Sequence, residues 1–146
     1  MSKQDLAKNK FDSGFNCAQS VLTPFARQMN IDVDTALKLS SGFGAGMGRT
    51  QGTCGALTGA YMVLGLKFGK QFPDDASNEK VVKIIQDITH KFETEHGFTN
   101  CSDLLNVDLK TKTGQASFTE KNLHESVCSH CVNSAVSFLE EIFKEN

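Results

Sequence analysis

The chain has 146 residues, of which 39% are hydrophobic and 22% charged, and its formal net charge is −2. These values predict one globular domain over residues 1–146 and give no basic surface for nucleic acid or anionic lipid, so neither is expected as a partner. No segment approaches the roughly 20 apolar residues of a membrane span, and Met1–Gly14 lacks the apolar core of a signal peptide, which makes the cytoplasm the expected location.

Apolar residues that recur every three or four positions predict helices along most of the chain, and no segment alternates as strands do. A kink or break is expected at Pro24, and Gly97 is placed to end the longest helix. The expected helices cover residues 15–29, 33–41, 54–70, 75–96 and 119–144, after a short helix or frayed arm over 2–13. Residues 97–122 are expected to be mostly loop, with one helical turn at 101–105. The predicted fold class is all-α, a single-domain bundle of five or six helices with no sheet.

Seven of the 12 glycines lie in Gly42–Ala60, and this segment also contains Cys54. Thr53 has the side chain of an N-cap, which would place Cys54 in the first turn of a helix. The free N–H groups and the positive end of the helix dipole would stabilise a thiolate there and lower the pKa of Cys54. Arg49 lies just upstream and would add positive charge, so it is a candidate cofactor-binding residue.

Gly52, Gly55 and Gly59 remove side chains on both sides of Cys54. Small residues allow another backbone or a bound group to approach closely, which makes these three glycines candidate cofactor-binding positions. Small residues four positions apart also serve simple helix packing, and that interpretation stays open. A phosphate-binding loop is disfavoured, because no strand precedes the glycines and no Lys-Ser or Lys-Thr pair follows them.

The chain has five cysteines, an odd number that argues against a framework of structural disulfides in a reducing compartment. Cys17, Cys128 and Cys131 lie on the apolar faces of their predicted helices, and Cys101 begins a helical turn. We therefore expect the thiols to converge around Cys54. The expected pocket contains Cys17, Cys54 and Cys101, with Cys54 closest to Cys17.

The cysteines stand in four motifs that follow one another in a specific order. The central motif reads Gly-Thr-Cys54-Gly55-Ala56-Leu-Thr-Gly59, preceded by "FNCAQSVL" (Phe15–Leu22) and followed by "TNCSDLL" (Thr99–Leu105) and by Cys128. Over nearly the whole chain this pattern resembles the family named for its cysteine signature, C_GCAxxG_C_C, a group of redox-active proteins. The resemblance implies that the shared cysteines are Cys17, Cys54, Cys101 and Cys128. Cys131 departs from the family pattern, in which an aromatic or aliphatic residue is usual.

Three kinds of function are open for these residues. The first is redox chemistry, either by a dithiol/disulfide couple of Cys54 with Cys17 or Cys101 or by an iron–sulfur cluster on four thiolates. The second is a metal-binding module without redox turnover, in which His124, Cys128 and Cys131 bind zinc or iron from one face of the last helix. The third is a structural or interaction protein whose cysteines are only packed.

Redox chemistry is the favoured interpretation, and it requires an electron donor or acceptor as a partner. The candidate catalytic residues are Cys17, Cys54, Cys101 and Cys128. The candidate ligands of an iron–sulfur cluster or a transition metal are these four cysteines together with Cys131 and His124. A homodimer is also expected, because the small-residue face of the helix after Cys54 suits close symmetric packing.

Overall fold

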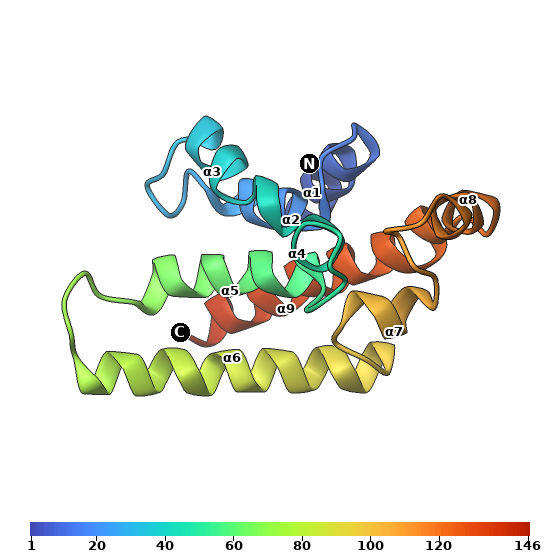
Figure 1. Ribbon diagram of the computed structural model, residues 1–146. Coiled ribbons are helices and arrows are strands. Elements are labelled where there is room, and N and C mark those ends of the chain that lie inside the picture. The colour runs from blue at the N-terminus through green and yellow to red at the C-terminus, as the bar shows by residue number, and fades with distance from the viewer.

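The computed structural model describes residues 1–146 and is all-helical (Figure 1). Eight right-handed α-helices make up most of the chain: α1 Lys3–Asp12, α2 Cys17–Leu22, α3 Val33–Leu39, α5 Gly55–Phe68, α6 Asp75–His96, α7 Cys101–Leu105, α8 Lys112–Glu120 and α9 Ser129–Glu145. The element α4 (Gly44–Met47) is a left-handed turn. The predicted class is confirmed, but the predicted count of five or six helices was too low.

The count was too low chiefly because the chain between α6 and α9 is more ordered than expected. α8 lies within residues 97–122, which were predicted to be mostly loop, and Thr111 caps it by accepting a hydrogen bond from the Gly114 N–H at 2.9 Å. The predicted last helix over 119–144 is also interrupted. A π-helix, η3 (His124–Cys128), separates α8 from α9.

The structure contains no sheet, as predicted. The single strand-like feature is an isolated antiparallel bridge between Thr53 and Asn100. A bridge of one residue pair is not a ladder, so it leaves the all-α assignment unchanged.

The helices form layers around α5 and α9, which cross the middle of the molecule in Figure 1. α6 runs along one side of this pair, and α1 to α3 cover the other. α7 follows the C-terminal end of α6, and α8 lies beyond the N-terminal end of α9. The largest fully buried side chains of the core include Phe25, Phe92, Leu22, Leu57, Leu64, Ile88 and Leu139.

Two helix boundaries follow directly from the sequence. The helix predicted from Phe15 breaks where expected, because α2 ends at Leu22 and a 3₁₀ turn, Thr23–Phe25, contains Pro24. α6 has the bounds predicted for the longest helix. Asp74 caps its start by accepting a hydrogen bond from the Ser77 N–H at 3.0 Å.

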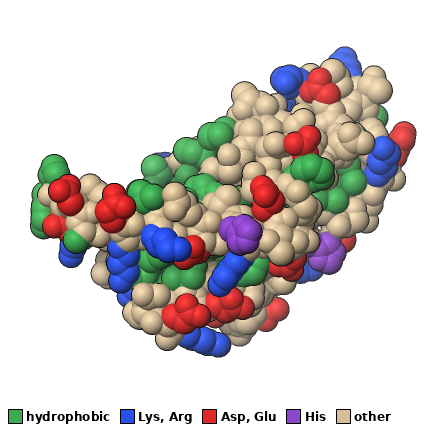
Figure 2. Space-filling model, turned by 90° about the horizontal axis from the view of Figure 1, so that it is seen from below, with side chains coloured by type: hydrophobic (Ala, Val, Ile, Leu, Met, Phe, Trp, Pro, Cys, Tyr) green, Lys and Arg blue, Asp and Glu red, His purple; other side chains and the backbone are tan.

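The exposed face of α6 carries charged side chains of both signs (Figure 2). Two ion pairs lie at this helix, Lys83 with Asp87 at 2.9 Å and Lys91 with Glu141 at 3.7 Å. Both are exposed, so each contributes little to stability. None of the helices combines the length and apolar character that crossing a bilayer requires.

Candidate functional site

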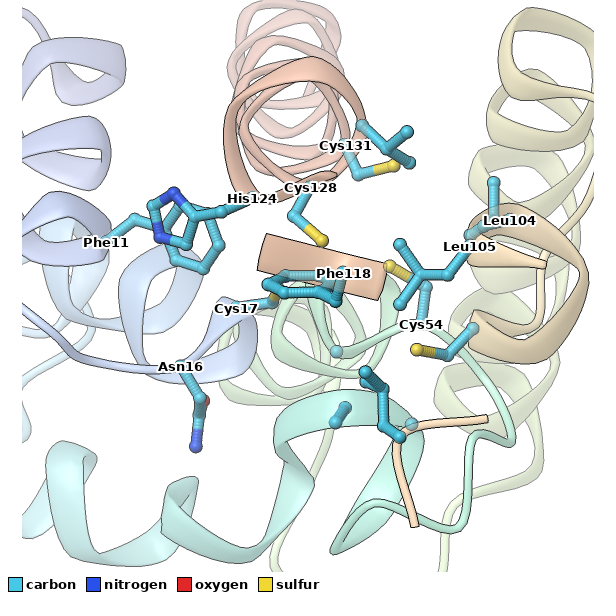
Figure 3. Close-up of a pocket in the computed structure, with 16 residues that line it drawn as sticks. Phe11, Asn16, Cys17, Cys54, Leu104, Leu105, Phe118, His124, Cys128 and Cys131 are labelled. Atoms are coloured by element: carbon cyan, nitrogen blue, oxygen red, sulfur yellow. The ribbon is translucent and has the colours of Figure 1, made fainter. Parts of the chain in front are cut away.

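All five cysteines line one apolar pocket of about 150 Å³ (Figure 3). The pocket lies where α2, α5, α7, η3 and α9 meet, and all five sulfurs are free thiols. Apolar side chains such as Phe11, Leu105 and Phe118 complete the wall. No lysine, arginine or carboxylate lines the pocket, and His124 is its one ionisable side chain besides the thiols. The predicted convergence of the thiols is therefore present.

Cys17 enters the pocket from the first turn of α2. Asn16 fixes this turn through a capping box with Gln19, in which each side chain accepts a hydrogen bond from the other's backbone N–H at 2.8 and 2.9 Å. The Asn16 amide also donates to the carbonyl of Ser41 at 3.1 Å. Asn16 therefore holds Cys17 against the segment that leads into the glycine-rich turn.

Cys54 and Cys101 are held together by the isolated bridge between their segments. The Cys54 N–H donates to the Thr99 carbonyl at 2.9 Å, and the Cys101 N–H donates to the Gly52 carbonyl at 2.7 Å. Thr53 is thus part of the bridge, and the N-cap position of α5 predicted for it is occupied by Cys54 itself. Two helices, α5 and α7, therefore begin side by side, each with a cysteine at its start.

Cys128 and Cys131 enter the pocket across the change from π-helix to α-helix. Cys128 is the last residue of η3, whose wider turn is closed by the bond from the Ser129 N–H to the His124 carbonyl. Cys131 lies in the first turn of α9 and is only 1% exposed. Cys128 is half-buried and lies close to Cys17.

A left-handed turn forms the wall of the pocket opposite η3. The five consecutive residues Ala45–Arg49 have φ between 50° and 71°. Such a run costs about 1–2 kcal/mol for each residue that is not glycine. Gly46 is required, since a Cβ there would lie 2.5 Å from the backbone nitrogen of Gly52. Ala45 and Gly46 face the pocket, so much of the glycine-rich segment serves to shape this wall.

Gln51 anchors the end of the left-handed turn. Its buried side-chain amide donates to the carbonyl of Val107 at 2.8 Å and accepts from the N–H of Leu109 at 2.9 Å. These bonds join the turn to the chain that follows α7. Nothing in the sequence marks Gln51 for this role, whereas Asn16 could have been found from the Asn-x-x-Gln pattern of a capping box.

Gly55 and Gly59 provide close approach, and the group that approaches is α2. A Cβ at Gly55 would lie 2.9 Å from the Phe43 carbonyl oxygen and 3.1 Å from the Cβ of Cys17. A Cβ at Gly59 would lie 2.8 Å from the carbonyl oxygen of Ala18. The small-residue face of α5, formed by Gly55 and Gly59, thus packs against the backbone of α2, which carries Cys17.

The thiols differ in acidity, and Cys54 is the one whose pKa is lowered. Contact with the Cys131 thiol and with the N–H groups of Ala56 and Leu57 lowers the pKa of Cys54, although burial opposes this. This direction is the one expected from the helix start, although contact with Cys131 is its largest cause. Arg49, the other group expected to help, is exposed on the left-handed turn and does not line the pocket.

The pKa values of three other thiols are raised. Contact with Cys128 and burial raise the pKa of Cys17 well above its ordinary value. Burial and the neighbouring thiols raise the pKa of Cys101 to about 12. Contact with Cys54 and burial raise that of Cys131. Cys17 and Cys54 line the same pocket, as expected, and their closeness to one another stays a prediction.

His124 lies at the edge of the pocket, where its ring stacks on Phe11 at 3.9 Å between centroids. Its ligand atom comes within 4.8 Å of carboxylate oxygens of Asp12 and Glu125, in a group that contains no cysteine. Lys8 pairs with both carboxylates, at 3.1 and 2.9 Å. The structure therefore brings His124 to these exposed side chains and does not gather it with Cys128 and Cys131 at metal-ligand distance.

The fold and the pocket define an all-helical protein built around a buried cluster of thiols. The family model described as "Putative redox-active protein (C_GCAxxG_C_C)" matches residues 15–142, and the chain belongs to this family. No curated protein and no solved structure matches the chain. The family assignment therefore supports redox activity and names no substrate or cofactor.

Proposed function

We propose that this protein carries out thiol redox chemistry in the five-cysteine pocket, with Cys54 as the reacting thiolate. The observation that carries the proposal is the position of Cys54 at the N-cap of α5, among four other thiols and with its pKa lowered. A thiolate is the nucleophile in thiol–disulfide exchange, and a second thiol nearby is needed to complete the exchange. The pocket holds Cys54, as the nucleophile, and the other thiols within one apolar cavity.

An iron–sulfur cluster is the second candidate, and one observation favours it. Thiolates of Cys17, Cys54, Cys101 and Cys128 would supply the four ligands that such clusters require, and they come from four separate segments. No cationic side chain lines the pocket, so a metal centre would be the natural counter-charge for several thiolates. When bound, a cluster would supply one-electron transfer. If a cluster is bound in the pocket, the residues of the left-handed turn and α7 would keep water from it.

A mononuclear zinc site has less support. Zinc–sulfur bonds of about 2.3 Å in a tetrahedron place ligand sulfurs roughly 4 Å apart. The group of ligand atoms that approach one another within 4.8 Å consists of Asp12, His124 and Glu125, where Lys8 already neutralises the carboxylates. The arrangement of the thiols favours redox chemistry over this alternative.

The test begins with protein purified without oxygen and analysed for iron, zinc and acid-labile sulfide. Metal-free protein is then treated with a small excess of iodoacetamide at pH 7, and the labelled cysteine is found by mass spectrometry. We expect Cys54 to react at least tenfold faster than Cys101, and Cys54→Ser to abolish the fast phase. Stoichiometric iron and sulfide would favour the cluster instead. Metal-free protein whose five thiols react only after denaturation would contradict both candidates.

A further inference from the structure

The thiols of the pocket are buried, so one of its walls must move before a reactant can meet them. Cys54 is 6% exposed and Cys101 is 7% exposed. Most walls are fixed, because α1, α2, α5 and α9 bury side chains in the main core. Gln51 anchors the left-handed turn, and the bridge at Thr53 holds the start of α7. The wall formed by α8 has no comparable anchor.

α8 is attached to the rest of the molecule only weakly. Its one buried residue is Gly114, and six of its nine residues are exposed. Its hydrogen bonds reach no residue before Leu109 or after Asn122, and it forms no ion pair. Asn106 and Asn122, both with φ 52°, lie on either side of it, and asparagine tolerates this left-handed backbone. The helix therefore has little packing to lose if it moves.

Phe118 is the side chain through which α8 meets the pocket. It is half-buried and is the one residue of α8 that lines the cavity. It packs against the small apolar cluster formed by Cys101, Leu105 and Leu109. Figure 3 shows its ring among the labelled cysteine side chains. Phe118 therefore covers part of the thiol cluster while α8 is in place.

We infer that α8 is the lid of the thiol pocket and that Phe118 holds it closed. This inference rests on the proposed thiol function, because it states how a reactant reaches Cys54. The apolar contact of Phe118 favours the closed form, since opening moves its ring into water. No hydrogen bond to the core has to break when α8 leaves. Segments with so few buried contacts open at a small fraction of the free energy of global unfolding.

The first test is hydrogen exchange of the full-length protein, purified without oxygen and kept reduced, followed by mass spectrometry. We expect the amides of residues 112–120 to exchange at least about a hundredfold faster than those of residues 55–68 in α5. Phe118→Ala should accelerate exchange in α8 further and leave α5 unchanged. Amides of α8 that exchange as slowly as those of α5 in the parent protein would refute the lid.

The second test measures access to the pocket by iodoacetamide, with each alkylated cysteine assigned by mass spectrometry. Phe118→Ala should raise the rates of the buried thiols of Cys54 and Cys101 roughly tenfold, because closure loses about half the burial of a phenylalanine. Phe118→Leu keeps most of the apolar contact and should react nearly as the parent protein does. Thr119→Ala, at the next position of α8, is the matched control. It is exposed and does not line the pocket, so the rates should not change.

The two tests separate the lid from the function of the thiols. Equal alkylation rates in the parent protein and in folded Phe118→Ala would overturn the lid and leave the thiol function standing. Suppose instead that Phe118→Ala exposes the pocket, but Cys54 reacts no faster than Cys101. The lid then stands, and the role of Cys54 as the nucleophile fails. Hydrogen exchange of the parent protein decides the mobility of α8 even where Phe118→Ala does not fold.

Discussion

The two ends of the helix bundle differ in how regular their backbone is. Around Leu64 and Leu139, away from the thiols, α5, α6 and α9 are regular helices that pack buried aliphatic side chains. At the thiol end, the chain contains a left-handed turn, a π-helix and an isolated bridge. Irregular backbone of this kind tends to lie at functional sites. The regular helices around Leu64 and Leu139 thus provide packed core, and the irregular backbone at the other end positions the five thiols.

The largest effect should come from the regular end. Leu64→Ala removes a fully buried side chain and should cost about 2–5 kcal/mol of unfolding free energy through lost burial and a cavity. Chemical denaturation measures this. Because Leu64 does not line the pocket, the alkylation rate of Cys54 in the folded variant should not change. A changed rate would show that the two ends are not independent.

Gly55→Ala should be next and should affect both properties. The added methyl group would meet the Phe43 carbonyl and the Cβ of Cys17, so we expect a loss of roughly 1–3 kcal/mol despite the better helix propensity of alanine. The displacement of α2 should also alter the alkylation rate of Cys54. Gly65→Ala, on the same helix with no atom within 4 Å, is the matched control and should stabilise. A raised melting temperature for Gly55→Ala with unchanged thiol reactivity would contradict the role given to this glycine.

The thiol end should also make stability depend on alkaline pH. Cys101 has a pKa of about 12 in the folded protein, whereas an ordinary thiol ionises at about 8.5. Between these values the unfolded chain has lost a proton that the folded chain retains, so stability falls as pH rises, by up to about 1.4 kcal/mol per pH unit for this thiol. The raised pKa values of Cys17 and Cys131 act in the same direction.

Cys54 acts with the opposite sign, because its pKa is lowered in the folded protein. Its contribution is present above about 8.5 and is lost as the pH falls through the folded pKa. Denaturation of the reduced protein between pH 8.5 and 10.5 tests the net effect. Cys101→Ala should make the fall of unfolding free energy with pH less steep, by up to about 1.4 kcal/mol per pH unit. An unchanged slope in this variant would show that Cys101 ionises in the folded protein as it does in the unfolded chain.

The smallest effect concerns strain in the left-handed turn. Arg49 is exposed with φ 62°, so Arg49→Gly should raise stability by up to about 1 kcal/mol by relieving an unfavourable backbone conformation. Gln86→Gly, at an exposed position within α6, should lower stability by a similar amount. Thermal denaturation should therefore give a higher melting temperature for Arg49→Gly and a lower one for Gln86→Gly. If both variants are destabilised, the turn at Arg49 is not left-handed.

The regular end was predictable from sequence, and the irregular end was predictable only in part. The periodicity and the terminal residues of α6 gave its bounds, because local signals and packing agree there. The convergence of the thiols followed from inward-facing cysteines and from the glycines around Cys54. The left-handed turn could not be predicted, since Ala45, Met47 and Arg49 adopt a backbone that their own preferences oppose.

The register of Cys131 relative to Cys128 was also beyond the sequence. Periodicity gives the face of a helix on which Cys131 lies, but the π-helix before it shifts the register by an amount that only tertiary packing decides. α8 was missed for a related reason. Its sequence has only two apolar residues, Ala116 and Phe118, and contains a glycine, Gly114, so its N-cap and its contacts rather than local propensity make it a helix.

The bridge between Gly52–Cys54 and Thr99–Cys101 has a consequence for the order of folding. It joins segments that are distant in the chain, and closing such a loop has an entropic cost that only later contacts offset. On a ribosome, Cys17 and Cys54 emerge long before Cys131 exists to contact them. The part of the lowered pKa of Cys54 that comes from Cys131 therefore develops only after α9 has been made and has packed, so Cys54 is less acidic in a nascent chain than in the completed fold.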